Sequence, residues 1–317
     1  MMRDDQLILD LLESGEPALV YRSLHELLDN PLDHPAVEFA KENLLGGNGV
    51  QKMLRAMHPD GYWLQLRGDK SAYIGDDVEY GSYATTHFVL SYLMELGLTR
   101  ELPQIALAAD RYLSLQKEDG DFWNHYSCLF AFNIRTFIRL GYRQDERLER
   151  TIQLMLSTER PDNGYLCETH EGKRKKRPVK SCFRGSLKAL RAFGEMPEYW
   201  QHPRCLGLVD YFLERDGVFR SNDLQTPVKH ELEMMLFPFT WRSSLLEVLL
   251  ALGKMGYGKD ERLTRAWAKL EEKRDEDGRY ILDWTPYQCP WKVGKRGEAN
   301  EWVTFYALLA KKYRDRG

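Results

Sequence analysis

The sequence has no long apolar stretch and no large excess of charge of either sign. None of its 317 residues fall in a run of about 18 apolar residues, so we predict no membrane-spanning helix. The first residues, MMRDDQLILDLLESGEP, carry acidic side chains early and lack the apolar core and cleavage site of a signal peptide. The formal net charge of −3 gives no reason to expect nucleic acid or an acidic membrane as a partner.

Cysteine is scarce, and strand-like segments are missing. The five cysteines are Cys128, Cys167, Cys182, Cys205 and Cys289. An odd number of widely spaced cysteines does not suggest a disulfide framework, so reduced thiols and a cytoplasmic location are expected. We also expect no β-strand, because β-branched residues are scattered and the segments around the Gly turns are short.

Glycine, in contrast, recurs at a fixed spacing. Leu-Gly or Phe-Gly closes an apolar run at four positions: Gly97, Gly141, Gly194 and Gly253. An acidic or amide residue precedes glycine at four others: Gly120, Gly164, Gly217 and Gly278. The gaps between the two sets are 23, 23, 23 and 25 residues, and such an internal period indicates a repeat architecture. The first set suits the left-handed residue that follows a helix.

Each repeat is typical of two helices joined by a short turn. Residues 88–96 are apolar nearly all round, as in a helix buried on most faces, whereas 262–270 carry one apolar stripe, as in an outer helix. Residues 1–58 are less regular and 59–317 contain the repeat units, without a linker between them. We therefore predict a single all-α domain over 1–317, in which helix pairs stack against one another.

An aromatic residue follows each Asp-Gly or Asn-Gly turn. Residues 116–123, QKEDGDFW, resemble the Gln-x-x-(Asp/Glu)-Gly-x-Trp turn that is repeated in terpenoid cyclases, with one additional residue before the Trp. Degenerate copies occur at 60–63, 163–165, 216–219 and 277–280. The resemblance covers most of the chain and points to the terpenoid-cyclase and protein-prenyltransferase superfamily, in particular to short squalene-cyclase-like prokaryotic proteins. It implies an α/α toroid, a single ring of five or six pairs of inner and outer helices around a cavity.

The acid motifs of that superfamily are absent. Class II cyclases protonate their substrate with Asp-x-Asp-Asp, and zinc-dependent prenyltransferase β-subunits use Asp-x-Cys; neither occurs here. The nearest acidic cluster is Asp76, Asp77 and Glu79, where neighbouring carboxylates would raise one another's pKa and leave one as a general acid. The alternative is a set of helix N-terminal acids that complement the dipole. His87, on the next helix, is either a catalytic side chain facing the cavity or a hydrogen-bonded core histidine.

Residues at Gly turns and inner-helix starts are the candidates for substrate contact. In the cyclases, aromatic rings at such places hold apolar substrate and stabilise carbocations. The predicted substrate-binding residues are Tyr83, Tyr126, Phe183, Arg184, Trp241, Trp284, Trp302 and Tyr306. Such aromatics can instead staple neighbouring repeats together, which we favour for Trp63 and Trp123.

The cysteines offer a second kind of chemistry. Cys128 and Cys182 each lie at the start of an inner helix, and Cys167 lies in the turn between those helices. With His125 or His170 they could form a Cys3His zinc site; buried structural cysteines and a reactive thiol are the alternatives. No other cofactor is expected. The loop 173–180 holds six basic residues in eight and is either a phosphate-binding or acidic-partner segment or a solvated surface loop.

Three functions remain open. The first is an enzyme that acts by acid catalysis on an apolar, isoprenoid-like or phosphorylated small molecule held in a toroid cavity. The second is a non-catalytic binding or scaffold protein. The third is a carbohydrate-active (α/α) barrel hydrolase or lyase, in which Asp76 or Asp77 with Asp283 would supply the two carboxylates that glycoside hydrolysis requires. The sequence does not determine the oligomeric state.

Overall fold

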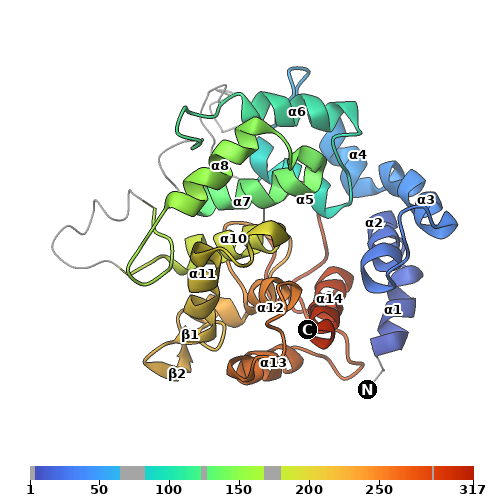
Figure 1. Ribbon diagram of the computed structural model, residues 1–317. Coiled ribbons are helices and arrows are strands. Elements are labelled where there is room, and N and C mark those ends of the chain that lie inside the picture. The colour runs from blue at the N-terminus through green and yellow to red at the C-terminus, as the bar shows by residue number, and fades with distance from the viewer. Residues whose placement is uncertain (1–3, 65–82, 123–126, 168–179, 288) are drawn as a thin grey trace. The chain divides into compact units, whose positions relative to one another are not determined.

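The computed structural model describes residues 4–64, 83–122, 127–167, 180–287 and 289–317, and these residues are largely helical (Figure 1). They belong to two compact units. Unit 1 contains residues 1–51, 212–287 and 291–317, and unit 2 contains residues 52–211 and 288–290. The single domain over 1–317 stays a prediction. No helix in the described part of the chain has both the length and the apolar character that crossing a membrane requires.

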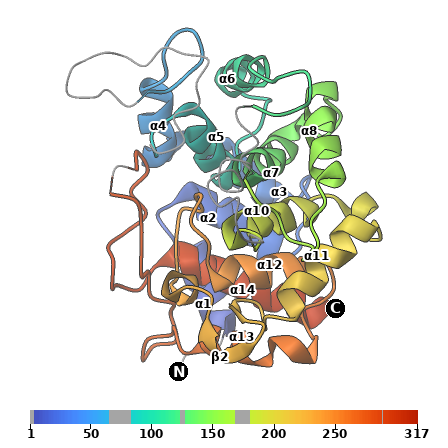
Figure 2. The ribbon, with the colours of Figure 1, turned by 90° about the vertical axis from the view of Figure 1, so that its left-hand side faces the viewer.

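Unit 2 alternates buried and half-exposed helices, as the repeat predicts. The buried helices are α5 (Thr86–Glu95), α7 (Ser127–Phe137) and α10 (Phe183–Phe193). The helices that bury one face are α6 (Pro103–Leu113), α8 (Glu146–Ser157) and α11 (Pro203–Leu213), with the short π-helix η3 (Ile138–Tyr142) and 3₁₀-helix η4 (Pro197–Tyr199) in the connections. Helix α7 packs against α5, α8 and α10, and Figure 2 shows it beside α10.

The sequence of α7 explains its central place in unit 2. All eleven residues from Ser127 to Phe137 are buried, and Arg135 is the only charged residue among them. Its guanidinium lies 2.6 Å from the carboxylate of Glu95 on α5, which is fully buried. A buried charge needs a partner of opposite sign, so this ion pair accompanies the packing of α5 against α7.

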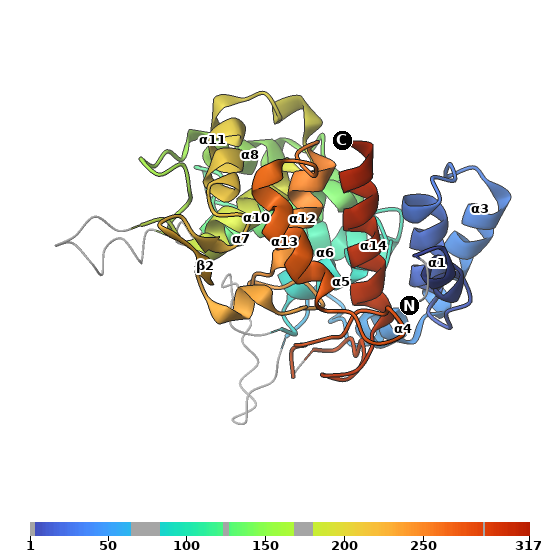
Figure 3. The same cartoon turned by 90° about the horizontal axis from the view of Figure 1, so that it is seen from below.

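Unit 1 brings the two ends of the chain together. Its elements from the first part of the chain are α1 (Asp4–Leu12), α2 (Pro17–Arg22), the π-helix η1 (Ser23–Leu27), α3 (Pro35–Glu42), η2 (Asn43–Gly46) and the start of α4 (Asn48–Arg55). Those from the last part are η5 (His230–Glu233), α12 (Leu245–Lys254), η6 (Glu261–Leu263), α13 (Thr264–Glu271) and α14 (Glu301–Arg316). Helix α14 contacts α1, α2 and α12, and Figure 3 shows it running beside α12.

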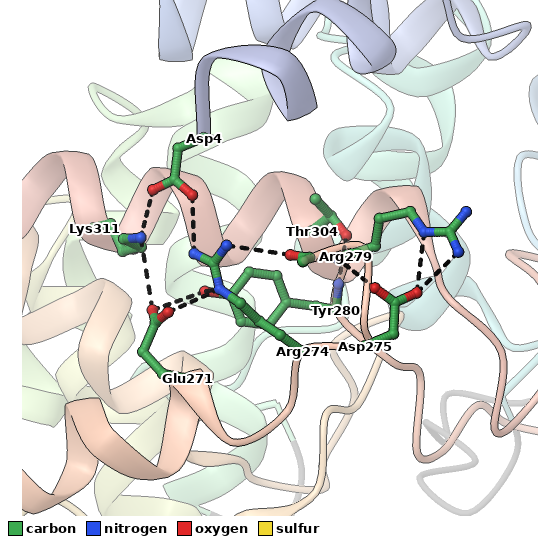
Figure 4. A network of polar contacts seen from close by, with 9 residues as sticks. Asp4, Glu271, Arg274, Asp275, Arg279, Tyr280, Thr304 and Lys311 are labelled. Carbon is green, nitrogen blue, oxygen red and sulfur yellow. Dashed lines mark hydrogen bonds and ion pairs between the residues drawn. The ribbon is translucent and has the colours of Figure 1, made fainter. Parts of the chain in front are cut away.

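A polar network connects α1 and α14, the first and last helices of the chain, to the end of α13 (Figure 4). Arg274 donates to Asp4 of α1 at 2.9 Å and lies 2.8 Å from Glu271, while Lys311 of α14 contacts both carboxylates. Tyr280 completes the network by donating to Glu271 at 2.9 Å. Burial raises the pKa of Asp4, but its bonds to Lys311 and Arg274 outweigh this and hold that pKa below its ordinary value.

The prediction that the chain has no strand is wrong. A short antiparallel pair, β1 (Phe219–Arg220) and β2 (Asp223–Pro227), lies in unit 1 (Figure 1). It follows the turn at Asp216 and Gly217, which both have positive φ, of 42° and 75°. That turn reverses the chain directly into a hairpin, and the strands are too short to show a period of two in the sequence.

The glycine pattern corresponds to helix ends in most repeats, with instructive exceptions. Left-handed glycines stand at Gly97, Gly120, Gly141, Gly217 and Gly278, as the pattern predicts. Gly194, however, caps α10 with a right-handed φ of −58°. Gly253 lies inside α12, and the left-handed residue after that helix is Gly256. In the Asn163-Gly164 turn, Asn163 takes the positive φ, because asparagine tolerates that conformation better than most side chains.

Candidate functional site

Two tryptophans predicted to bind substrate meet around one arginine in unit 1. Trp241 and Arg242 directly precede α12, whose first turn is capped by Ser244. Trp284 reaches the same place because residue 236 forms a parallel bridge with it and the Phe237 amide donates to its carbonyl at 3.2 Å. A segment before an inner helix is thereby joined to one that lies more than forty residues later in the sequence.

The geometry of this site combines aromatic faces with charge. The guanidinium carbon of Arg242 lies 4.5 Å from the ring centroid of Trp284 and 5.6 Å from that of Trp241. Its Nη1 lies 3.2 Å from the Glu231 carboxylate. All four side chains are half-buried, so they are held in place and still meet solvent. We call Trp241, Arg242, Trp284 and Glu231 the tryptophan–arginine site.

Asp283 stands next to this site and carries a second carboxylate. Its Oδ2 accepts a hydrogen bond from the Met235 amide at 2.8 Å and lies 3.0 Å from Nζ of Lys273. Met235 follows η5, which carries Glu231. Both carboxylates are therefore anchored to one short stretch of chain, each beside a cation.

Trp302 and Tyr306 do not join the tryptophan–arginine site. Both lie on α14 and are 3% and 1% exposed, in an aromatic cluster around Phe237 with ring centroids 5.2 and 5.3 Å from it. The Tyr306 hydroxyl accepts a hydrogen bond from the fully buried Arg22 at 2.5 Å. In the structure these two predicted substrate contacts are part of the core of unit 1.

The predicted residues of unit 2 lie at two places. His87 is buried beside the rings of Phe88 and Phe132, and burial lowers its pKa to about 3. Its imidazole is therefore neutral at pH 7 and lacks the imidazolium proton that a histidine usually gives as a general acid. Tyr83 contacts Phe88 with ring centroids 5.4 Å apart. At the start of α10, Phe183 is buried and Arg184 is half-buried.

The cysteines are partly brought together. Cys128 Sγ lies 3.7 Å from Cys167 Sγ, and the Cys182 amide donates to the Tyr165 carbonyl two residues before Cys167. Within the described ranges, no group of three or more His, Cys, Asp and Glu side chains is arranged to hold a metal ion. His125 and His170, the two candidates for the fourth ligand, lie outside those ranges, and the Cys3His zinc site stays a prediction.

Several other predicted residues also fall outside the described part of the chain: Asp76, Asp77, Glu79 and Tyr126, with residues 173–179 of the basic loop. Sequence reasoning, for its part, missed Arg242 and Glu231. Arg242 had a usable signal, because it directly follows a tryptophan at the start of an inner helix. No sequence signal identified Glu231, since its contact with Arg242 depends on how the chain between the two residues folds.

A separate pocket in unit 1 has a volume of about 440 Å³ and contains none of the predicted residues. Its polar lining comes from Asp10 of α1, Glu301 and Thr304 of α14, Asn300 and Arg279. Asn300 caps α14 through Oδ1, and Thr304 accepts a hydrogen bond from the Tyr280 amide. These two side chains therefore already serve the local structure of unit 1.

Comparisons with known proteins assign a fold but no family. No protein-family model matches the sequence, and no curated protein matches it. Among solved structures, a family 88 glycosyl hydrolase from Bacteroides vulgatus is similar with a TM-score of 0.55 over 99% of both chains, at 12% sequence identity. This likeness confirms the predicted fold class, all-α with the architecture of an α/α toroid.

The family resemblance drawn from the Gly turns is wrong. The similar structure is a glycosyl hydrolase and not a terpenoid cyclase or prenyltransferase. The physical reason lies in what the motif records. A glycine with positive φ, such as Gly120 at 91°, lets the chain turn sharply after a helix, whatever the reaction. The turn therefore indicates helix pairs in a repeat, and it carries no information about the substrate.

Proposed function

We propose that the chain is a carbohydrate-active hydrolase or lyase that binds a sugar at the tryptophan–arginine site. The observation that carries the proposal is the placement of two half-buried indole rings around Arg242. Aromatic faces stack on the apolar faces of sugar rings, while an arginine and a carboxylate supply donors and acceptors for hydroxyl groups. The α/α-toroid fold shared with a glycosyl hydrolase supports the same class of substrate, at the level of fold alone.

The chemistry needs carboxylates, and two are available: Glu231 contacts Arg242 of the site, and Asp283 directly precedes Trp284 in the sequence. The Glu231 carboxylate lies 3.2 Å from Nη1 of Arg242, and the Asp283 carboxylate lies 3.0 Å from Nζ of Lys273. In the proposed reaction, a carboxylate acts in one of two ways. It is a base that activates water or a sugar C–H, or its negative charge stabilises positive charge at the reacting carbon.

Binding is the first test. Titration calorimetry with a panel of neutral and acidic oligosaccharides should find at least one ligand for the wild-type protein. For that ligand, Trp241→Ala and Trp284→Ala should each weaken binding about tenfold, equivalent to about 1.4 kcal/mol. Trp200→Ala is the matched control, because Trp200 is also half-buried but belongs to unit 2. No binding across the panel, or equal losses in all three variants, would contradict the proposal.

Catalysis is the second test. With a bound oligosaccharide as substrate, new reducing ends report hydrolysis and absorbance of a new double bond reports elimination. Glu231→Gln and Asp283→Asn keep the shape of each side chain and remove its charge. If either carboxylate acts as a base, its variant should lose about 100-fold or more in turnover, with sugar binding retained. Turnover unchanged in both variants would leave a sugar-binding site without a catalytic role for them.

A further inference from the structure

Two sulfur atoms of unit 2 lie in contact although their residues are 39 positions apart. Cys128 is the second residue of α7, and Cys167 follows the aromatic turn at Tyr165. Their Sγ atoms are 3.7 Å apart, and Oγ of Ser127 lies 3.6 Å from the Cys167 sulfur. No disulfide joins any of the five cysteines, all of which the structure describes.

The surrounding chain fixes this contact from both sides. Tyr165 is fully buried; its amide donates to Ser186 of α10 and its hydroxyl donates to the Met155 carbonyl of α8. Gly185 of α10 lies against Ser127, so closely that a Cβ at this glycine would come within 2.5 Å of the Ser127 hydroxyl. Helices α7 and α10 therefore pack closely beside Ser127, whose hydroxyl contacts the Cys167 sulfur.

The distance suits bond formation. A disulfide holds its sulfur atoms about 2.05 Å apart, so closure requires about 1.6 Å of approach, within reach of side-chain rotation. The start of α7 also supplies polar neighbours to the Cys167 sulfur. Sγ of Cys128 and Oγ of Ser127 both lie within hydrogen-bonding distance of it, at 3.7 and 3.6 Å.

We propose that Cys128 and Cys167 are a peroxide-reactive dithiol that closes reversibly to an intramolecular disulfide. The two side chains are 8% and 1% exposed, which excludes a bulky disulfide such as oxidised glutathione and restricts the oxidant to a small molecule such as hydrogen peroxide. The Cys167 thiolate attacks one peroxide oxygen, breaks the O–O bond and releases hydroxide, which leaves a sulfenic acid. Cys128 then attacks that sulfur, forms the S–S bond and expels water. In sum, two thiols and one hydrogen peroxide give one disulfide and two waters.

Cys205 shows what the pair has that another buried cysteine lacks. It is fully buried in the same unit, and burial raises the pKa of its thiol to about 12. Both features disfavour the thiolate that peroxide oxidises. Cys205→Ser is therefore the matched control for substitutions in the pair.

The experiment exposes the reduced full-length protein to a small excess of hydrogen peroxide, alkylates the remaining thiols and measures intact and peptide masses. We expect three alkylated cysteines instead of five, a crosslink that joins the peptides of Cys128 and Cys167, and recovery of all five thiols with dithiothreitol. Cys205→Ser should form the same crosslink. In Cys128→Ser, oxidation should stop at a Cys167 sulfenic acid, which dimedone traps.

Three results would overturn the proposal. All five thiols could remain after peroxide, or the crosslink could join a different pair, such as Cys167 with Cys182. Peroxide resistance that disappears on adding a chelator would assign the sulfur atoms to a metal ion instead. The mapping of the wild-type crosslink stands without the variants, so a folding defect in Cys128→Ser would not remove the test. Closure should also raise the unfolding temperature, because the bond joins positions 39 apart in sequence.

Discussion

Both units bury an arginine, and they neutralise it in different ways. In unit 1, Arg22 pairs with Glu26 one helical turn away, and the rings of Phe305 and Tyr306 cover its guanidinium at 4.7 and 4.9 Å. The Glu26 side chain is still 15% exposed. In unit 2, Arg135 pairs with Glu95 from another helix at 2.6 Å, where the carboxylate is fully buried, and Glu195 lies farther away at 3.7 Å. The first pair is local and partly solvated, whereas the second is a long-range link.

The candidate functional groups of the two units also differ in solvent exposure, and those of unit 2 are again the more buried. Unit 1 holds its tryptophan–arginine site at partial exposure, where a sugar can approach the rings. Unit 2 keeps its sulfur pair and His87 almost entirely out of solvent. Unit 2 thus depends more than unit 1 on desolvated polar groups, so single changes there should cost more stability than corresponding changes in unit 1.

Removal of the buried carboxylate should have the largest effect. Glu95→Ala leaves the charge of Arg135 without its nearest partner and should cost about 3–5 kcal/mol in the free energy of unfolding. Glu26→Ala should cost less, about 1–3 kcal/mol, because water can replace part of this carboxylate and Tyr306 still accepts from Arg22. Urea denaturation of both variants measures the difference. Equal losses would contradict the contrast between the units.

His87 should make unit 2 sensitive to acid. Its pKa is about 3 in the folded state against an ordinary 6.5, so between these values the unfolded chain binds the proton more strongly. Stability should therefore fall as pH falls, by about 3 kcal/mol between pH 7 and pH 4 from this residue.

Comparing the pH dependence of wild type and His87→Gln isolates that contribution, because the variant cannot take up the proton. The control is His230→Gln in unit 1, whose side chain is 91% exposed and which should follow the wild-type curve. If His87→Gln retains the full wild-type loss at low pH, the buried imidazole is not its source.

Substitution of two left-handed glycines should distinguish the cost of backbone strain from the cost of steric crowding. Gly256 in unit 1 has φ of 88° with nothing within 4 Å of an added Cβ, so Gly256→Ala should cost about 1–2 kcal/mol of strain. Gly120 in unit 2 has φ of 91°, and its added Cβ would lie 2.5 Å from the Arg150 carbonyl. Gly120→Ala should cost about 1–3 kcal/mol more. Thermal unfolding of the two variants tests whether crowding adds to strain.

The smallest effect is expected at the exposed end of the network in Figure 4. Arg279 pairs with Asp275 and Asp277 and is 47% exposed, so Arg279→Ala should change stability by no more than about 0.5 kcal/mol. Arg274, which is 7% exposed and bonded to Asp4, should cost about 1–3 kcal/mol on change to Ala. A loss at Arg279 as large as that at Arg274 would show that exposure does not set these costs.

Several features were readable in the sequence because they depend on neighbouring residues. The apolar run 88–96 predicts a helix buried on most faces, and α5 has this property. Gly97 and Gly141 mark helix ends because a left-handed residue favours glycine. Where another residue supplies that conformation, as at Asn163, or a glycine serves close packing, as at Gly253 against Tyr313, the pattern assigns the left-handed conformation to the wrong residue.

The sequence by itself determined that this chain forms alternating buried and half-exposed helices, because apolar periodicity and glycine turns are local properties. It also singled out Trp241, Trp284, Cys128 and Cys167 as residues of interest. Only the tertiary structure decided their partners: Trp284 lies against Arg242, Cys128 against Cys167, and Trp302 and Tyr306 inside the core of unit 1. Contacts between residues tens of positions apart depend on how helices pack, and no local period records that.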